Sequence, residues 1–209
     1  MQIAAIQYQT IIDYPGKLAC VLFTLGCNFQ CWYCHNHWLV KSHNGISCLK
    51  MDVVMDLLVE RRQWLDGVVI SGGEPTIHKN LPDFLSEVKS MGYSVKLDTN
   101  GSNPQMVKCI LTNNLVDFIA MDIKTVPVEG EHSKVIGIPD DEIVTNIKES
   151  INIIKESGVN YQFRTTWLPG IHNLNTIESI QSNYLGEISL IINTFTFENG
   201  ILADQLKKF

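Results

Sequence analysis

The chain has 209 residues, of which 45% are hydrophobic and 18% charged, and its net charge at pH 7 is −6. This composition suits one domain with a sizeable core and excludes a disordered chain, while the acidic balance argues against a nucleic-acid partner. No run reaches the roughly 18 apolar residues of a membrane span. Residues 1–10 lack the positive charge and the apolar stretch of a signal peptide, so we expect a cytoplasmic protein without a membrane partner.

Strands and helices are expected to alternate along the chain. Apolar, β-branched runs predict six strands, at residues 19–25, 67–71, 94–98, 118–122, 161–166 and 188–193. Amphipathic stretches predict five helices, at residues 50–63, 81–91, 104–113, 140–157 and 174–182. The fourth helix is the clearest, since Asp140 or Asp141 can cap its start and Gly158 can end it. This order predicts parallel β/α units, either in an open doubly wound sheet or in an incomplete (β/α)8 barrel.

Polar residues follow the predicted strands at the points where the strands end. They are residues 26–36, the turn Gly72–Pro75, residues 98–101, Asp122 with Lys124, and residues 164–166. The carboxyl ends of parallel strands share one edge of the sheet, and that edge carries the active site in such folds. These segments are therefore expected to meet in one pocket.

Six cysteines occur in the chain, and three of them lie within eight residues. A chain of this length without an export signal favours metal or redox chemistry over structural disulfides. Cys20 lies in a predicted strand and Cys109 in a predicted amphipathic helix, so both are expected in the core. Cys48 lies in a predicted loop.

Cys27, Cys31 and Cys34 form a C-x3-C-x2-C pattern. Thiolates are the usual ligands of iron–sulfur clusters, and three ligands on a four-iron cube leave one iron open for another molecule. Zinc is an alternative, with His35 or His37 as a fourth ligand, and a Cys31–Cys34 dithiol is a second alternative.

The cysteine triplet together with Gly72-Gly73-Glu74-Pro75 resembles the radical S-adenosylmethionine superfamily. Further segments are similar to activating enzymes of glycyl-radical enzymes, closest to the group that serves anaerobic ribonucleoside-triphosphate reductase. These segments are residues 12–17, 33–36, 97–101, 120–124 and 164–166. The resemblance covers residues 8–173 and fades beyond Phe195.

The resemblance implies a single radical S-adenosylmethionine domain over residues 1–209, folded as an incomplete (β/α)6-type partial TIM barrel with parallel strands. It implies a [4Fe-4S] cluster on Cys27, Cys31 and Cys34. It also implies an enzyme that cleaves S-adenosylmethionine to a 5′-deoxyadenosyl radical, which removes hydrogen from a glycine of the partner enzyme. Flavodoxin or ferredoxin is the implied electron donor.

The resemblance also assigns contacts to S-adenosylmethionine. The backbone carbonyls of Gly72 and Gly73 receive its ammonium, with Glu74 positioning the turn and Asp98 nearby. Lys124 pairs with its carboxylate and Asp122 approaches its ribose. The Tyr33 backbone meets the adenine and Arg164 lines the far side. Asp98, Thr99 and Asp122 are also candidates to hold a monovalent cation.

Three other functions stay open. One is activation of a different glycyl-radical enzyme, such as pyruvate formate-lyase. Another is small-molecule radical chemistry, as in 7-carboxy-7-deazaguanine synthase. The third is a non-catalytic zinc-binding interaction module, which would leave the Gly-Gly-Glu-Pro turn, Asp98 and Lys124 without a role.

Overall fold

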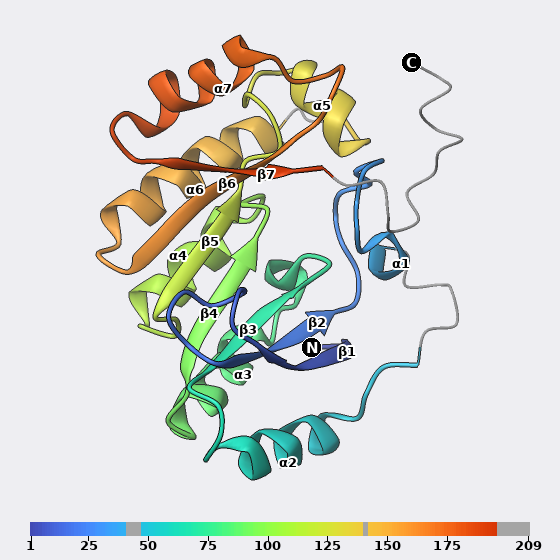
Figure 1. The fold of residues 1–209 in the computed structure, drawn as a ribbon, viewed down its shortest axis with the longest axis vertical. Coiled ribbons are helices and arrows are strands. Elements are labelled where there is room, and N and C mark those ends of the chain that lie inside the picture. The colour runs from blue at the N-terminus through green and yellow to red at the C-terminus, as the bar shows by residue number, and fades with distance from the viewer. Residues whose placement is uncertain (41–46, 140–141, 196–209) are drawn as a thin grey trace.

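The computed structural model describes residues 1–40, 47–139 and 142–195. At its centre is one seven-stranded sheet whose strand order follows the chain (Figure 1). The strands are β1 (Ile3–Thr10), β2 (Ala19–Thr24), β3 (Gly67–Gly72), β4 (Ser94–Thr99), β5 (Phe118–Asp122), β6 (Asn160–Trp167) and β7 (Leu190–Thr194). Strands β2 to β7 are parallel, and β1 pairs antiparallel with β2. All six predicted strands are confirmed, and β1 is an additional one.

Helices connect the parallel strands. They are α1 (His37–Val40), α2 (Met51–Arg61), α3 (Leu81–Ser90), α4 (Pro104–Thr112), α5 (Glu131–Ile136), α6 (Ile143–Glu156) and α7 (Leu174–Ile180). A 3-10 turn at Pro75–Ile77 follows β3, and a π-helical turn at Gln181–Leu185 follows α7. The five predicted helices correspond to α2, α3, α4, α6 and α7. The proposed caps Asp140 and Asp141 lie outside the described residues.

The sequential strand order separates the two predicted architectures. A doubly wound sheet reverses its strand order near the middle, whereas here each strand pairs with the next one along the chain. Among the described residues, β1 and β7 are the two sheet edges and do not pair with each other. The fold is therefore an incomplete barrel of parallel strands, extended by one antiparallel strand.

Alternate residues of each strand face opposite sides of the sheet. One side packs on the helices in a large apolar core, to which Leu22, Ile70 and Leu97 belong. The other side carries a smaller apolar cluster formed by Tyr14, Ala19, Val21 and Val69. The polar residues at the carboxyl ends of the strands come after the residues of this cluster along the chain. The small cluster therefore forms the apolar floor beneath these polar side chains.

The cysteines outside the triplet differ in burial. Cys20 is fully buried, as predicted. Cys109 is exposed, so its predicted core position is wrong. Helix α4 instead buries the face that carries Val107, Ile110 and Leu111, and Cys109 lies on the opposite face.

Within the described ranges, no helix is both long and apolar enough to cross a membrane.

Candidate active site

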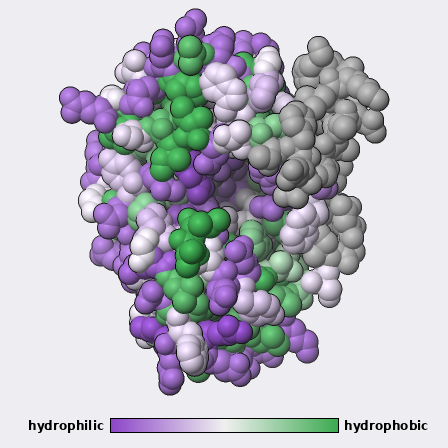
Figure 2. All heavy atoms as spheres, viewed as in Figure 1, coloured by the Kyte–Doolittle hydropathy of each residue, from purple (hydrophilic) through white to green (hydrophobic). Residues whose placement is uncertain are grey.

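The carboxyl ends of the parallel strands surround a cavity of about 350 Å³, which is within the size range of small-molecule sites. Every site residue selected from the sequence lines this cavity: Cys27, Cys31, Tyr33, Cys34, Gly72, Gly73, Glu74, Asp98, Asp122, Lys124 and Arg164. Asp13, Ser71, Asn100 and Asn193 line it too, and sequence reasoning had not selected them as site residues. In Figure 2, hydrophilic residues surround a central recess between two hydrophobic patches.

The cysteine loop follows β2 and is held by backbone hydrogen bonds. Gly26 N donates to Leu39 O at 2.8 Å, and Gln30 N donates to Ile136 O at 2.8 Å. All three cysteines are free thiols. Burial raises the pKa of Cys27 to about 12 and that of Cys31 to about 11. The thiols are thus neutral in this form, and binding of a metal centre must release their protons.

The three thiols line the same cavity. In the part of the chain that the structure describes, no three His, Cys, Asp or Glu side chains are placed to share a single metal ion. A zinc ion needs its ligands within about 2.3 Å of one centre, whereas each thiolate of a cluster binds a different iron. A donor set of three thiols has the chemistry of a cluster site with one open iron.

The glycine turn after β3 packs directly against the cysteine loop. Gly73 N donates to Thr24 O at 2.9 Å, and Glu74 N donates to Gly26 O at 2.8 Å. A Cβ on Gly73 would lie 1.9 Å from Gly26 O, and a Cβ on Gly72 would lie 2.4 Å from Thr24 N. Both positions require glycine, because the obstructing atoms are backbone.

We expect Gly73→Ala to abolish binding of the S-adenosylmethionine that the sequence resemblance implies, because the added methyl group must push the turn and the cysteine loop apart. Gly158→Ala is the control: its φ of +73° adds strain, but a Cβ there meets nothing within 4 Å. The control should lose about 1–2 kcal/mol of stability and keep its ligand affinity. Calorimetric titration of both variants checks this, and unchanged affinity in Gly73→Ala would contradict it.

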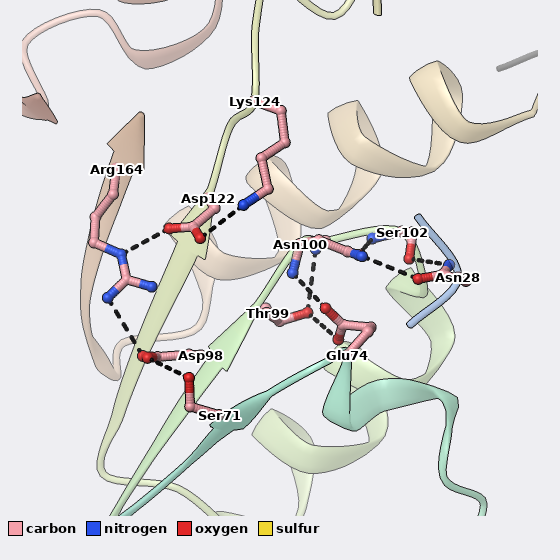
Figure 3. Close-up of polar contacts among 11 residues, drawn as sticks. Asn28, Ser71, Glu74, Asp98, Thr99, Asn100, Ser102, Asp122, Lys124 and Arg164 are labelled. Atoms are coloured by element: carbon pink, nitrogen blue, oxygen red, sulfur yellow. Dashed lines mark hydrogen bonds and ion pairs between the residues drawn. The ribbon is translucent and has the colours of Figure 1, made fainter. Parts of the chain in front are cut away.

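Glu74 is nearly fully buried, with 1% of its surface exposed. Its Oε1 accepts hydrogen bonds from Thr76 N and Thr76 Oγ1. Oε1 also accepts from Thr99 Oγ1, and Oε2 accepts from Asn100 N, both at 2.7 Å (Figure 3). Burial raises the pKa of Glu74, and the hydrogen bonds partly offset this shift. Glu74 thus joins the turn after β3 to the end of β4, which extends its predicted role of positioning the turn.

Asn28 connects the cysteine loop to the same region. Its side chain donates to Ser102 Oγ at 2.7 Å and accepts from Asn100 Nδ2 at 3.0 Å (Figure 3). The loops after β2, β3 and β4 therefore form one hydrogen-bonded unit.

Charged side chains form a second network on the ends of β4, β5 and β6. Arg164 Nε lies 2.8 Å from Asp122 Oδ1, and Arg164 Nη1 lies 3.5 Å from Asp98 Oδ1 (Figure 3). Lys124 Nζ lies 2.9 Å from Asp122 Oδ2. Burial raises the pKa of Asp122, but Arg164 and Lys124 outweigh it and hold this pKa well below its usual range. Asp122 is therefore a carboxylate at any physiological pH.

Tyr33 closes the cavity between the second and third cysteines. It is 4% exposed, and its ring centroid lies 5.5 Å from that of Trp32 in an edge-to-face arrangement. Tyr33 therefore adds an apolar surface to the cavity next to Cys31.

A partial α/β barrel with three thiols, a glycine turn and paired charges at its strand ends defines a class of cofactor-binding enzymes. Residues 21–181 match the radical SAM superfamily. The chain belongs to this superfamily and is one of its enzymes, so it is expected to hold a [4Fe-4S] cluster and S-adenosylmethionine, and the residues around the cavity fit both.

Curated relatives include activating enzymes. A Methanocaldococcus jannaschii protein, provisionally named glycyl-radical enzyme activating enzyme MJ1227, is 33% identical over 81% of this chain and 69% of its own length. The pyruvate formate-lyase-activating enzyme of Staphylococcus aureus is 28% identical over 69% of this chain and 61% of its own length. The predicted resemblance is confirmed, although the chain aligns with only 60% to 69% of such relatives.

Solved structures share the fold. TYW1 with a lysine-pyruvate adduct superposes with a TM-score of 0.64 at 15% identity, covering 88% of this chain and 66% of that one. Streptococcus suis SuiB bound to S-adenosylmethionine gives a TM-score of 0.63 at 14% identity, covering 87% and 43%.

Proposed function

We propose that the protein is an activase that removes a hydrogen atom from a glycine of a partner glycyl-radical enzyme, and that the partner is anaerobic ribonucleoside-triphosphate reductase. The observation that carries the proposal is the single cavity shared by the three thiols, the Gly72–Gly73 turn and the charged strand ends. The 33% identity to a protein provisionally named as such an activating enzyme supports it.

Cys27, Cys31 and Cys34 would hold the cluster. When bound, the cluster and S-adenosylmethionine supply one-electron reductive cleavage and a 5′-deoxyadenosyl radical. Gly72 and Gly73 leave room for the ligand's ammonium to approach the backbone. Our proposal thus gives the protein the tasks of binding, orienting and shielding the reacting groups.

The charged network is complementary to the amino-acid part of S-adenosylmethionine. Lys124 offers an ammonium toward the ligand's carboxylate, and the backbone carbonyls of Gly72 and Gly73 accept its ammonium, with Asp98 nearby. Lys124 is held at 2.9 Å by Asp122, so it is oriented before the ligand binds. In this proposal Asp122 faces the ribose, the Tyr33 backbone meets the adenine, and Arg164 closes the far side.

The open barrel supports a protein substrate. Strands β1 and β7 do not pair within the described residues, so the sheet is open rather than a closed barrel (Figure 1). In this proposal an extended loop of the partner reaches the cavity at the carboxyl ends of the strands. Activation of pyruvate formate-lyase is a second candidate, favoured by the 28% identity to the Staphylococcus aureus enzyme.

The remaining parts of the proposal follow from the sequence prediction. A single domain over residues 1–209, flavodoxin or ferredoxin as electron donor, a cytoplasmic location and the absence of a nucleic-acid partner stay predictions. A monovalent cation held by Asp98, Thr99 and Asp122 also stays a hypothesis, and it competes with the inference drawn below.

Electron paramagnetic resonance tests the proposal. We expect a glycyl-radical signal when the anaerobically reconstituted, reduced protein is mixed with S-adenosylmethionine and anaerobic ribonucleoside-triphosphate reductase. A reductase whose radical-site glycine is replaced by alanine is the control and should give no signal. A signal only with pyruvate formate-lyase would move the assignment to the second candidate. Cleavage of S-adenosylmethionine without a radical on either partner would contradict activase function.

A further inference from the structure

Lys96 is a buried cation beside the cavity for which the sequence reading gave no role. It lies in the middle of β4, and none of its surface is exposed. Its strand neighbours are Val69 on β3 and Phe118 on β5. These neighbours lie at the level of the apolar floor, where an isolated ammonium group would be very costly.

The Lys96 side chain avoids this cost because its ammonium group extends to the polar strand ends. Residues two apart on a strand share a face, so Lys96 and Asp98 point to the same side of the sheet. Lys96 Nζ lies 2.5 Å from Asp98 Oδ1 and 6.0 Å from the centroid of the Phe118 ring. The ammonium group is therefore held between a carboxylate and the face of an aromatic ring.

With this contact, each side-chain oxygen of the three residues suggested as ligands of a monovalent cation has a partner within the protein. Asp98 Oδ1 faces Lys96 and Arg164. Asp98 Oδ2 accepts from Ser71 Oγ at 3.0 Å (Figure 3). Both oxygens of Asp122 are paired, as described above. Thr99 Oγ1 donates to Glu74 at 2.7 Å and accepts from Gly101 N at 3.1 Å.

The charges around Asp98 and Asp122 also argue against a bound monovalent cation. Asp98 and Asp122 supply two negative charges, and the cations that pair with them are Lys96, Lys124 and Arg164. The negative charges of Asp98 and Asp122 are therefore balanced by side chains of the protein, so these two carboxylates do not need another cation between them.

We propose that the Lys96 ammonium group is a built-in monovalent cation, which holds the Asp98 carboxylate in place and makes ligand binding independent of sodium and potassium ions. Lys96 acts through Asp98 and is a positioning residue. The inference rests on the S-adenosylmethionine site of the proposed function, but it needs no glycyl-radical partner.

The test compares sodium, potassium and choline chloride at equal ionic strength, near 0.15 M, because choline is too large to enter the site. For the unaltered protein, we expect the thermal midpoint of the metal-free form and the affinity of the reconstituted form for S-adenosylmethionine to be the same in all three salts. In choline, Lys96→Met should lower that affinity by about tenfold or more. Sodium or potassium should restore it and raise the midpoint of this variant by about 3 °C or more, because the small ion fills the vacated position.

Lys89→Met is the matched control. It removes another lysine–aspartate pair, with Lys89 Nζ 2.7 Å from Asp117 Oδ1, but this pair is only partly buried and neither residue lines the cavity. It should show no response that distinguishes the three salts. A cation-specific recovery confined to Lys96→Met separates the proposed role from a general loss of stability.

Two outcomes would overturn the inference. One is a higher midpoint or affinity of the unaltered protein in sodium or potassium than in choline, which decides the question even if Lys96→Met does not fold. The other is a folded Lys96→Met variant that responds equally to all three salts. Failure of the unaltered protein to bind S-adenosylmethionine in any salt would count against the proposed function, while the midpoint comparison would still test Lys96.

Discussion

Replacing Cys31 by alanine is expected to reduce the cluster content and the cleavage of S-adenosylmethionine to background. Cys31 is the middle thiol of the three that line the cavity. Its loss leaves two thiols for a cluster that needs three protein ligands beside one open iron. After anaerobic reconstitution, iron content, the visible absorption of the cluster and the release of 5′-deoxyadenosine should all fall together.

Cys109→Ala is the control for this variant, because it removes an exposed thiol on α4 that is not among the lining residues. It should bind about four irons per chain, like the unaltered protein. Cys31→Ala with full iron content and normal cleavage would show that the cluster is held elsewhere. Stoichiometric zinc without cleavage in the unaltered protein would restore the zinc alternative.

Most of the fold was accessible from the sequence, because β2, β3, β5 and β7 are largely apolar runs, and β4 and β6 alternate apolar and polar residues. Strand β1 was missed because Gln7, Tyr8 and Gln9 are three consecutive exposed residues, so the strand lacks an alternating pattern. Its pairing with β2 comes from tertiary structure, which local patterns do not report. Helix α5 was missed because its six residues lie between Gly130 and Gly137, too short a stretch to show helical periodicity.

The site was predictable where its residues form compact motifs and not where they depend on packing. The cysteine triplet and the Gly72–Pro75 turn are local, and the rule that parallel strand ends meet brought in Asp98, Lys124 and Arg164. Lys96 was overlooked because a lysine in a strand is usually on a solvated face. Its spacing of two residues from Asp98 was the available signal, and its burial depends on the position of β4 between β3 and β5, which local patterns do not report.

Glu74 is expected to be the residue of the site whose loss costs the most stability. Glu74→Ala removes the acceptor for four donated hydrogen bonds, from Thr76 N, Thr76 Oγ1, Thr99 Oγ1 and Asn100 N. Buried donors without a partner each cost about 1–3 kcal/mol, with partial relief from rotating hydroxyl groups or an entering water. We therefore expect a loss of about 3–5 kcal/mol in the free energy of unfolding, and a thermal midpoint lower by about 10 °C.

Urea unfolding of the metal-free, reduced protein measures this loss without a contribution from the cluster. Glu74→Gln should be intermediate, because its carbonyl oxygen can still serve Thr76 and Thr99, while its amide group meets Asn100 N as a second donor. Glu87→Ala, an exposed glutamate on α3, should stay within about 0.5 kcal/mol of the unaltered protein. If Glu74→Ala proved as stable as Glu87→Ala, the hydrogen bonds of Glu74 would not be what joins the turn after β3 to the end of β4. The cavity would then depend on the glycine contacts of that turn alone.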